Sequence, residues 1–448
     1  MESFEVLVAG AGPAGGELAR CLAQAGVSVC LVDRLADMRQ AAFSSAALPL
    51  ASVSRFGLPA EVLAASWHGW QLLGPNAVWH QWQQQHALGA VLDFGALRHW
   101  LTVQVQALGG EVRLASSVVA VETNSNSNQL ITKLRDPHGK ITKLKSNWVV
   151  DATGQSRCLI GETSNLVKDH LLLGIGLEWL LKVEMGRWQQ WSKKLSFVLG
   201  SSWVPNGYGW VFPMQPGLLK VGVCRLPPPR QSKQQSGLAL GLLQKQLLKE
   251  LALGEATVIN RHGGIIRSRV QRSDCHGRGR LLALGDAVST ANLLGGEGIR
   301  HAMESARVLL PLLLDALANP GDEKANQGLI KTYKQKLQGQ LGSRWSLSGR
   351  LAKRTWWGLD NKAADRRMER LLQGLNHCSA ADLSELLFNY RFERFGLRAL
   401  PIYLARGWCS KNTRSCKALN CTDSDDVAKA GGGQKGAVAK ATKETVVW

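Results

Sequence analysis

The sequence of 448 residues lacks the features of several common protein classes. No apolar run reaches about 18 residues, the length that a membrane-spanning helix needs. The best candidate, Val308 to Ala318, is short and contains Pro311 and Asp315. The N-terminus enters a strand-like segment at once, so we expect no secretory leader. These absences favour a cytoplasmic protein without a spanning helix.

Metal-ligand spacing is also missing. The nine cysteines form no C-x-x-C pair, and none has histidine partners at zinc spacing. We therefore expect free thiols in a reducing compartment and no metal site.

Acidic residues are scarce beside basic ones, which gives a net charge of +20. Lys331 to Arg370 holds eleven Lys or Arg against three acids, with Trp345, Trp356 and Trp357 among them. Such a segment suits peripheral contact with the inner face of an anionic membrane, although it also describes an ordinary solvated helical face. No recognition fold accompanies the charge, so we expect no nucleic-acid partner.

What the chain does contain begins with a glycine turn. Glu5 to Ala9 is an apolar run typical of a buried parallel strand, and a helix is expected from Pro13 to Ala25. The turn between them reads Gly10-x-Gly12-x-x-Gly15, and a second strand ends at Asp33. This spacing is typical of a dinucleotide site, with the pyrophosphate at the helix N-terminus and the acid on a ribose hydroxyl.

The number of such turns indicates which dinucleotide binds. An NAD(P)H-dependent flavoenzyme with two Rossmann domains should show two fingerprints, and this chain has one, at its N-terminus. We therefore assign the site to FAD.

Two later segments support this assignment. Trp148 to Asp151 reads as a short strand followed by a turn at Ala-Thr-Gly154. Another apolar strand ends at Gly285-Asp286, and the loop Gly295-Gly-Glu-Gly298 opens a helix expected from Ile299 to Leu314. Ligands of open α/β sheets bind at the carboxyl ends of strands, where Asp286 stands. The exposed N–H groups of the glycine loop could hold an anion or a flavin carbonyl.

Together with a fourth segment, Gly207-Tyr-Gly-Trp-Val-Phe-Pro213, these motifs resemble the geranylgeranyl-reductase-like flavoproteins, within the p-hydroxybenzoate hydroxylase fold group. The resemblance covers about residues 4 to 400. It implies reduction of carbon–carbon double bonds in a prenyl substrate by hydride transfer from reduced FAD, with NAD(P)H or a small iron–sulfur protein as the electron donor. The resemblance and the motifs imply the following FAD-binding residues: Gly10, Gly12, Pro13, Ala14, Gly15, Asp33, Arg34, Arg98, Gly154, Gly285, Asp286, Gly296, Gly298 and Ile299.

The fourth segment implies the substrate-binding residues. In the family this strand faces the cavity that holds the prenyl chain, so Trp210 and Phe212 would line it, and aromatic faces suit an isoprenoid. Tyr208 and Ser44 are the implied catalytic residues. Tyr208 would donate the proton, and Ser44 would relay one through water.

One departure from the family keeps alternatives open. Where the family carries Cys-Gly-Gly, this chain reads Ser44-Ser45-Ala46, and a hydroxyl is a weaker acid and nucleophile than a thiol. An FAD-dependent monooxygenase of the same fold, a carotenoid-cyclase-like flavoprotein and a flavin-binding scaffold therefore remain alternatives.

The expected fold is α/β: a Rossmann-like FAD-binding domain interrupted by a mixed or antiparallel β-sheet substrate domain. A C-terminal helical region and a basic tail complete it. The expected bounds are 1–70, 95–165 and 262–320 for the FAD-binding domain, 71–94 and 166–261 for the substrate domain, 321–405 for the helical region and 406–448 for the flexible tail.

Overall fold

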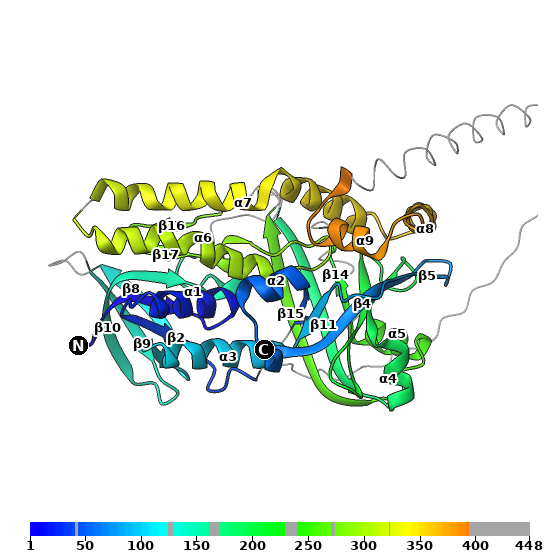
Figure 1. The fold of residues 1–448 in the computed structure, drawn as a ribbon, viewed down its shortest axis with the longest axis horizontal. Coiled ribbons are helices and arrows are strands. Elements are labelled where there is room, and N and C mark those ends of the chain that lie inside the picture. Colours follow the sequence, from blue (N-terminus) through cyan, green and yellow to red (C-terminus); the bar gives the residue numbers. More distant parts are fainter. Residues whose placement is uncertain are drawn as a thin grey trace, which may run out of the picture. The chain divides into compact units, whose positions relative to one another are not determined.

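The chain folds around two β-sheets, seen side by side in Figure 1. A computed structural model describes residues 1–40, 44–123, 129–161, 171–228, 240–269, 274–321 and 323–393, all of which belong to one compact unit, Met1–Ala399. The expected tail, 406–448, lies outside the described residues. The α/β fold predicted from the sequence is confirmed.

The first sheet carries the dinucleotide motif. Its strand order is β16-β17-β10-β1-β2-β7, and strands β17, β10, β1, β2 and β7 run parallel. Strands β9 and β8 extend it from β10 as an antiparallel hairpin. Near-continuous apolar runs form the central strands because helices or other strands cover both faces. The bounds are β1 Ser3–Ala9, β2 Val29–Val32, β7 Glu111–Arg113, β8 Ser117–Thr123, β9 Leu130–Arg135, β10 Ile141–Asp151, β16 Gly277–Arg278 and β17 Leu281–Ala283.

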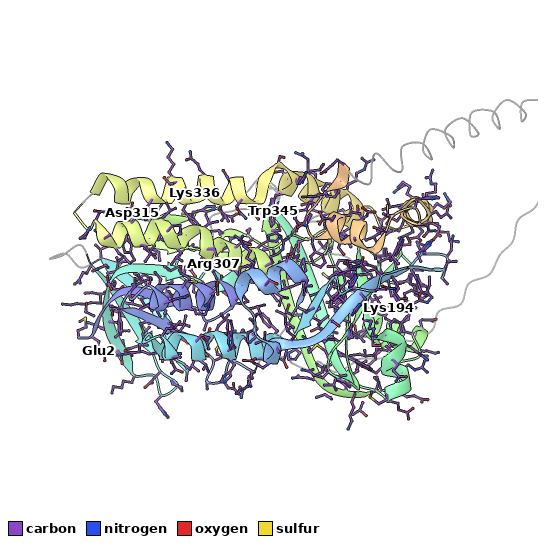
Figure 2. The ribbon with its side chains drawn as sticks, viewed as in Figure 1. Glu2, Lys194, Arg307, Asp315, Lys336 and Trp345 are labelled. Carbon is purple, nitrogen blue, oxygen red and sulfur yellow. The ribbon has the colours of Figure 1, made fainter. Side chains whose placement is uncertain are left out.

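Helices cover this sheet on the side of the glycine turn. Helix α1 (Pro13–Gln24) packs against α3 (Phe94–Ala107) and α6 (Ile299–Ala318), and α7 (Glu323–Trp357) lies outside α6 (Figure 1). Arg307 of α6, labelled in Figure 2, forms an ion pair of 2.5 Å with the buried Glu17 of α1. This pair joins two helices that are nearly three hundred residues apart in the sequence.

The second sheet is mostly antiparallel. Its order is β15-β11-β14-β13-β12-β4-β6-β3, with β5 paired to β4, and only β12 and β4 among these pairs run parallel. The bounds are β3 Ala47–Pro49, β4 Leu63–Leu73, β5 Trp79–Gln83, β6 Gly89–Leu92, β11 Leu171–Lys182, β12 Lys193–Leu199, β13 Gly207–Pro213, β14 Leu218–Arg225 and β15 Thr257–Arg269.

Each face of the second sheet has its own core. Helices α4 (Met185–Trp191) and α5 (Leu240–Glu250) cover one face. The other face is aromatic and packs against the end of α7, α8 (Lys362–Leu375) and α9 (Ala380–Leu387). The remaining elements are α2 Leu50–Phe56 and the 3₁₀ turns Ala60–Val62, Gly154–Ser156 and Gly285–Val288.

Strand pairing extends the second sheet beyond the expected domain bounds in two places. The second sheet already includes β3 and β4, so it begins near residue 47 and not at 71. Strand β15 remains paired with β11 to Arg269, beyond the expected return to the FAD-binding domain at 262. Strand β3 has three residues and lies at the sheet edge, so its sequence signal is weak, whereas β4 has 11 residues and lies between β12 and β6. Helix α4 lies within the expected substrate domain, 166–261.

The tryptophans of the basic segment are mostly internal. Trp345 is 2% exposed and Trp356 is 6% exposed, so neither indole is available to a membrane surface. Only Trp357 is partly exposed, and Lys353 lies 4.5 Å from its ring centre. Among the described residues, no helix is both long and apolar enough to cross a membrane.

Candidate functional site

Two glycines of the turn allow close packing, and the third leaves space for a ligand. Gly10 has a φ of 104°, and a Cβ there would lie 2.4 Å from the carbonyl oxygen of Ala152. A Cβ on Gly15 would lie 2.0 Å from the carbonyl oxygen of Gly10, so Gly15 lets α1 pack onto the turn. A Cβ on Gly12 would meet nothing within 4 Å. The turn is therefore closed by Gly10 and Gly15, and it is open at Gly12, where a pyrophosphate must approach.

The helix N-terminus next to this opening is bare. Gly12 is the N-cap of α1, no side chain caps it, and Pro13 occupies the first turn. Uncapped N–H groups and the helix dipole favour an anion at this end. Ala14 follows, buried against the loop of Gly285, where a Cβ would lie 2.7 Å from the Ala14 methyl carbon.

Asp33 lies at the carboxyl end of β2, beside the turn. Its Oδ2 accepts a hydrogen bond from the Ala11 N–H at 2.7 Å, and its Oδ1 accepts one from Leu35 at 2.9 Å. A carboxylate has about four lone-pair sites, so acceptor capacity remains for a ribose hydroxyl. Arg34, another predicted FAD-binding residue, follows Asp33 and is exposed.

The second loop is organised by Asp151. Its carboxylate accepts hydrogen bonds from the backbone and hydroxyl of Thr153 and from the N–H groups of Leu159 and Ile160, at 2.6 to 3.0 Å. These four bonds fill its acceptor sites, so Asp151 shapes the loop and is not free for a ligand. Gly154 opens the following turn with a φ of 69°, and the space beside it is empty.

The third loop brings Asp286 to the same edge of the sheet. Strands β17, β10, β1 and β2 are neighbours, so their carboxyl ends place Asp286, Gly154, Gly12 and Asp33 along one line. The Asp286 Oδ1 accepts a hydrogen bond from Thr290 at 3.2 Å. Burial raises the pKa of Asp286, against the lowering effects of Thr290 and Arg157.

A buried ion pair connects the second and third loops. Arg157 is 3% exposed, and its Nη2 donates to Asp274 Oδ1 at 2.8 Å and to Ser289 Oγ at 2.6 Å. The Ser289 hydroxyl also donates to Asp274, at 3.1 Å. Sequence reasoning missed this network, although Arg157 ends the quoted Asp151–Arg157 motif.

The loop after Leu293 is closed by its own backbone. Asn292 and Glu297 exchange N–H···O bonds of 2.7 and 3.0 Å, and Gly296 between them has a φ of 71°. The loop ends at Gly298, the uncapped N-cap of α6, so the helix from Ile299 presents free N–H groups. These are the features that the sequence predicted for holding an anion or a flavin carbonyl.

The side chain of Glu297 fastens this loop to the C-terminal region. It forms ion pairs with Arg300 and, at 3.2 Å, with His301, and it accepts a hydrogen bond from the Tyr390 hydroxyl at 3.1 Å. Burial alone would raise the pKa of Glu297, but Arg300 and His301 together lower it to about 2. Nothing in the sequence motif indicated this anchor.

The aromatic strand β13 lies against that loop. A Cβ on Gly296 would lie 2.6 Å from the Tyr208 hydroxyl oxygen, so this hydroxyl contacts the backbone of the predicted flavin loop. The Tyr208 ring packs on Trp356, with centres 4.8 Å apart, and Phe197 packs on Phe212 at 5.4 Å. Trp356 in turn donates its indole N–H to the Leu293 carbonyl at 2.9 Å. The structure thus brings together Tyr208 and Gly296, which were predicted from two separate segments of the sequence.

Ser44 and Arg98 are held by other protein groups. The buried Lys220 of β14 donates to the Ser44 carbonyl at 2.5 Å. Arg98 donates to the Gln40 carbonyl and lies 5.1 Å from the centre of the Phe94 ring. Burial lowers the pKa of Arg98, and the nearby carboxylates Asp33 and Asp37 act against that. Contacts of Ser44 and Arg98 with substrate or cofactor stay predictions.

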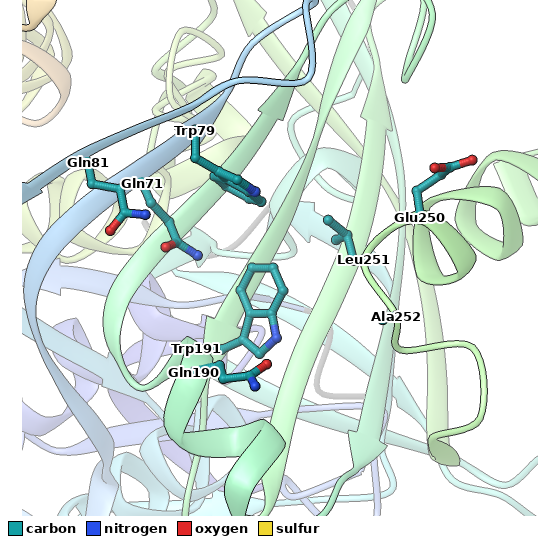
Figure 3. Close-up of a pocket in the computed structure, with 8 residues that line it drawn as sticks. All are labelled: Gln71, Trp79, Gln81, Gln190, Trp191, Glu250, Leu251 and Ala252. Atoms are coloured by element: carbon teal, nitrogen blue, oxygen red, sulfur yellow. The ribbon is translucent and has the colours of Figure 1, made fainter.

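Two cavities lie away from the glycine turn. One, of about 260 Å³, is shown in Figure 3 between the ends of α4 and α5, with Trp79 and Trp191 in edge contact at 5.8 Å. The other, of about 410 Å³, lies at the kink of α7, where Gly342 has a φ of 67°. Neither is lined by the predicted FAD-binding residues. Among the described residues, no cluster of three or more His, Cys, Asp and Glu side chains is arranged to hold a metal ion.

Taken together, the residues at the strand ends fit FAD. The opening at Gly12, the bare N-terminus of α1, the acceptor capacity of Asp33 and the position of Asp286 match the parts of a dinucleotide in order. The match of residues 3–49 to a family described as an FAD binding domain agrees with this geometry.

Comparison with whole proteins shows what the chain is similar to. The chain is 25% identical over 428 residues to a digeranylgeranylglycerophospholipid reductase of Haloferax volcanii, covering 91% of this chain and 99% of the relative. It is 23% identical to a geranylgeranyl diphosphate reductase of Synechocystis, covering 74% of this chain and 80% of the relative. Over most of its length the chain is therefore similar to geranylgeranyl and digeranylgeranylglycerophospholipid reductases, and its N-terminal segment matches an FAD binding domain.

Solved structures show the same fold for this geranylgeranyl-reductase-like chain. A geranylgeranyl bacteriochlorophyll reductase-like protein from Thermoplasma acidophilum superposes with a TM-score of 0.73 at 19% identity, covering 87% of this chain and 97% of the other. A p-nitrophenol 4-monooxygenase from Pseudomonas putida gives 0.66 at 18% identity, covering 87% and 98%. The resemblance stated from the sequence motifs is confirmed.

Proposed function

We propose that this protein reduces carbon–carbon double bonds of a prenyl-bearing lipid, with FAD as its cofactor. The contact of Tyr208 with Gly296 carries the proposal, because it joins an aromatic sheet face to the predicted flavin loop. An isoprenoid offers apolar surface and double bonds, which suit such a face. The names of the relatives from Haloferax volcanii and Synechocystis support the same substrate class.

Reduced FAD, when bound, supplies a hydride to one carbon of the double bond. The protein's own part is to bind, orient and exclude water. In this proposal the N-terminus of α1 neutralises the pyrophosphate, Asp33 accepts from a ribose hydroxyl, and Asp286 accepts from the ribityl chain. Trp210 and Phe212 line the prenyl chain on the aromatic face.

A proton must reach the other carbon of the double bond. Tyr208 is one candidate donor, because its hydroxyl contacts the flavin loop. Burial, followed by the effect of Cys224, raises the pKa of Tyr208 well above its ordinary value. The phenol is therefore protonated near neutral pH but is a weak acid. Ser44 would at most relay a proton through water.

The electron donor and the site of action complete the proposal. NAD(P)H reacting directly, or a small iron–sulfur protein, would reduce the flavin. In this proposal the enzyme works in the cytoplasm, at the inner face of a membrane that holds its prenyl-lipid substrate. Trp345 and Trp356 cannot serve as membrane anchors because both are buried, so basic side chains would make this contact.

An anaerobic reoxidation experiment tests the function. The flavin is reduced without oxygen, a geranylgeranyl-bearing glycerophospholipid in detergent micelles is added, and the return of oxidised-flavin absorbance is followed. We expect reoxidation by the unsaturated lipid and none by its fully saturated counterpart. Oxygen consumption that depends on the lipid would favour a monooxygenase. A flavin that no lipid reoxidises would contradict the reductase function and favour a scaffold.

A further inference from the structure

A single carboxylate interrupts the aromatic face of the second sheet. Glu178 lies on β11 and is 1% exposed, and its Oε2 accepts a hydrogen bond from the Trp210 indole N–H at 3.1 Å. Its Oε1 is buried and has no hydrogen-bond partner among the described residues. An unsatisfied buried oxygen is costly, so its retention calls for an explanation.

The contact between Glu178 and Trp210 is built into the sheet. Gly222 on β14 is the register partner of both residues, so Trp210 must cross an intervening strand to reach Glu178. A Cβ on Gly222 would lie 2.2 Å from the Trp210 Cζ2 atom. The missing side chain at Gly222 is therefore what allows the indole to lie across β14.

Two basic side chains lie near Glu178. Lys220 of β14 donates its hydrogen bond to the Ser44 carbonyl, and its charge lowers the pKa of Glu178. His262 of β15 is the direct register partner of Glu178. Burial lowers the pKa of His262, as do Lys220 and, from α3, Arg98.

These surroundings shift the pKa of Glu178. Burial raises the pKa of Glu178, and Lys220 and the Trp210 hydrogen bond only partly offset that effect. Two further ionisable groups on this face, Tyr208 of β13 and Cys224 of β14, both have raised pKa values and are neutral near pH 7. A buried carboxyl with a raised pKa keeps its proton to a higher pH than an exposed carboxyl does, and it is a stronger acid than a phenol.

We propose that the Glu178 carboxyl is the acid that protonates the substrate carbon. Tyr208, Trp210 and Phe212 alternate along β13 and so share one face, and Glu178 is bonded to the middle one. The acid thus stands on the surface proposed to hold the prenyl chain. This inference rests on the proposed function and names a residue that the sequence motifs did not indicate.

The step is balanced in atoms and electrons. The double bond takes a hydride from reduced FAD, which is oxidised, and a proton from Glu178. The carbon–carbon π bond, the bond that held the hydride in the reduced flavin and the carboxyl O–H bond break, and two C–H bonds form. The resulting carboxylate keeps the Trp210 N–H and the nearby charge of Lys220, and a proton from water restores the acid.

Glu178→Gln tests the proposal. The amide keeps the volume and an oxygen for Trp210 but has no carboxyl proton to transfer. In the anaerobic reoxidation experiment we expect the rate to fall by at least ~100-fold, within the usual range for loss of a general acid. The wild-type rate should fall as pH rises through the pKa of Glu178, and the variant should lack this limb.

Glu369→Gln is a matched control. Glu369 on α8 is also buried and also has a carboxylate oxygen without a hydrogen-bond partner among the described residues. It pairs with His80 at 3.4 Å, away from Trp210. We expect the rate of flavin reoxidation in Glu369→Gln, and its pH dependence, to match those of the wild type.

A second readout needs no turnover. When folding raises the pKa of a carboxyl, the free energy of unfolding falls as the pH increases from the pKa of the unfolded state through that of the folded state. The unfolding midpoint of Glu178→Gln should therefore rise relative to wild type as pH increases across this window. A difference that does not depend on pH would overturn the assignment of a protonated Glu178.

The two hypotheses fail in different ways. If wild-type flavin is reoxidised and Glu178→Gln reacts at the same rate with the same pH dependence, the role of Glu178 is wrong and the reductase function stands. If the wild type does not react with any prenyl lipid, the reductase function fails, and the proton-donor role fails with it.

Discussion

At the scale of single residues, two glycines of the same turn make opposite predictions. Gly12 has φ −71° and ψ −178°, an ordinary extended conformation, and open space beside it. We expect Gly12→Val to fold normally but to purify without FAD, because its methyl groups would occupy the pyrophosphate position. Absorbance of the purified protein measures this directly.

The matched variant is Gly15→Val. Its Cβ would lie 2.0 Å from the Gly10 carbonyl, so we expect a loss of about 1–3 kcal/mol or more in the free energy of unfolding. Urea titration separates the two outcomes. A Gly12→Val protein that retains stoichiometric FAD would contradict the N-terminal assignment.

Asp286 gives a second residue-scale prediction. Asp286→Ala removes a carboxylate at the strand end that accepts hydrogen bonds from the Thr290 hydroxyl and from the backbone of Ala291. We expect the Kd for FAD to rise about tenfold or more, the usual cost of losing a hydrogen bond to a charged group. Fluorescence titration of apoprotein with FAD measures it. Unchanged affinity would show that Asp286 does not contact the cofactor.

At the scale of elements, Arg157 joins two loops that the sequence separates by more than one hundred residues. Arg157→Leu would leave Asp274 buried with one fewer cationic partner. We expect a loss of about 3–5 kcal/mol in stability, as for other broken buried ion pairs. Urea denaturation measures it.

The double variant Arg157→Leu with Asp274→Leu is the control for that prediction. Removing both charges should recover a large part of the loss, because neither charge of this pair is then left buried without the other. If the double variant is as unstable as the sum of the single ones, the pair does not act as a unit.

How much could be predicted differs between local and long-range elements. The helix expected from Pro13 to Ala25 is found as Pro13–Gln24, because turn, cap and periodicity all lie within one segment. The aromatic strand is likewise found as Gly207–Pro213. Helix α4 was not predicted, because its seven residues, which include one methionine and two tryptophans, also fit a strand pattern.

The pairing of Glu178 with Trp210 could not be predicted in this way. It depends on the register of three strands and on the absence of a side chain at Gly222. The one available signal was a lone acid within the apolar run Leu171 to Leu181. Such a signal marks a residue for inspection but does not name its partner.

At the scale of the whole molecule, the predicted motifs converge although the expected domain bounds shift. The second sheet takes strands from near residue 47 up to Arg269, and the loop from Leu293 reaches across to it through Trp356. The predicted flavin loop and the aromatic face therefore meet at Gly296 and Tyr208. That junction, and not either sheet alone, is the basis of the proposed reaction.

The mass of the product after one anaerobic turnover tests this account most directly. Enzyme with fully reduced FAD is mixed with an equimolar amount of a geranylgeranyl-bearing glycerophospholipid. The lipid is then extracted, and its molecular mass is measured by mass spectrometry. We predict a product heavier by two hydrogen atoms, formed in step with flavin oxidation. An unchanged mass with rearranged double bonds, or a gain of one oxygen atom once air is admitted, would contradict it.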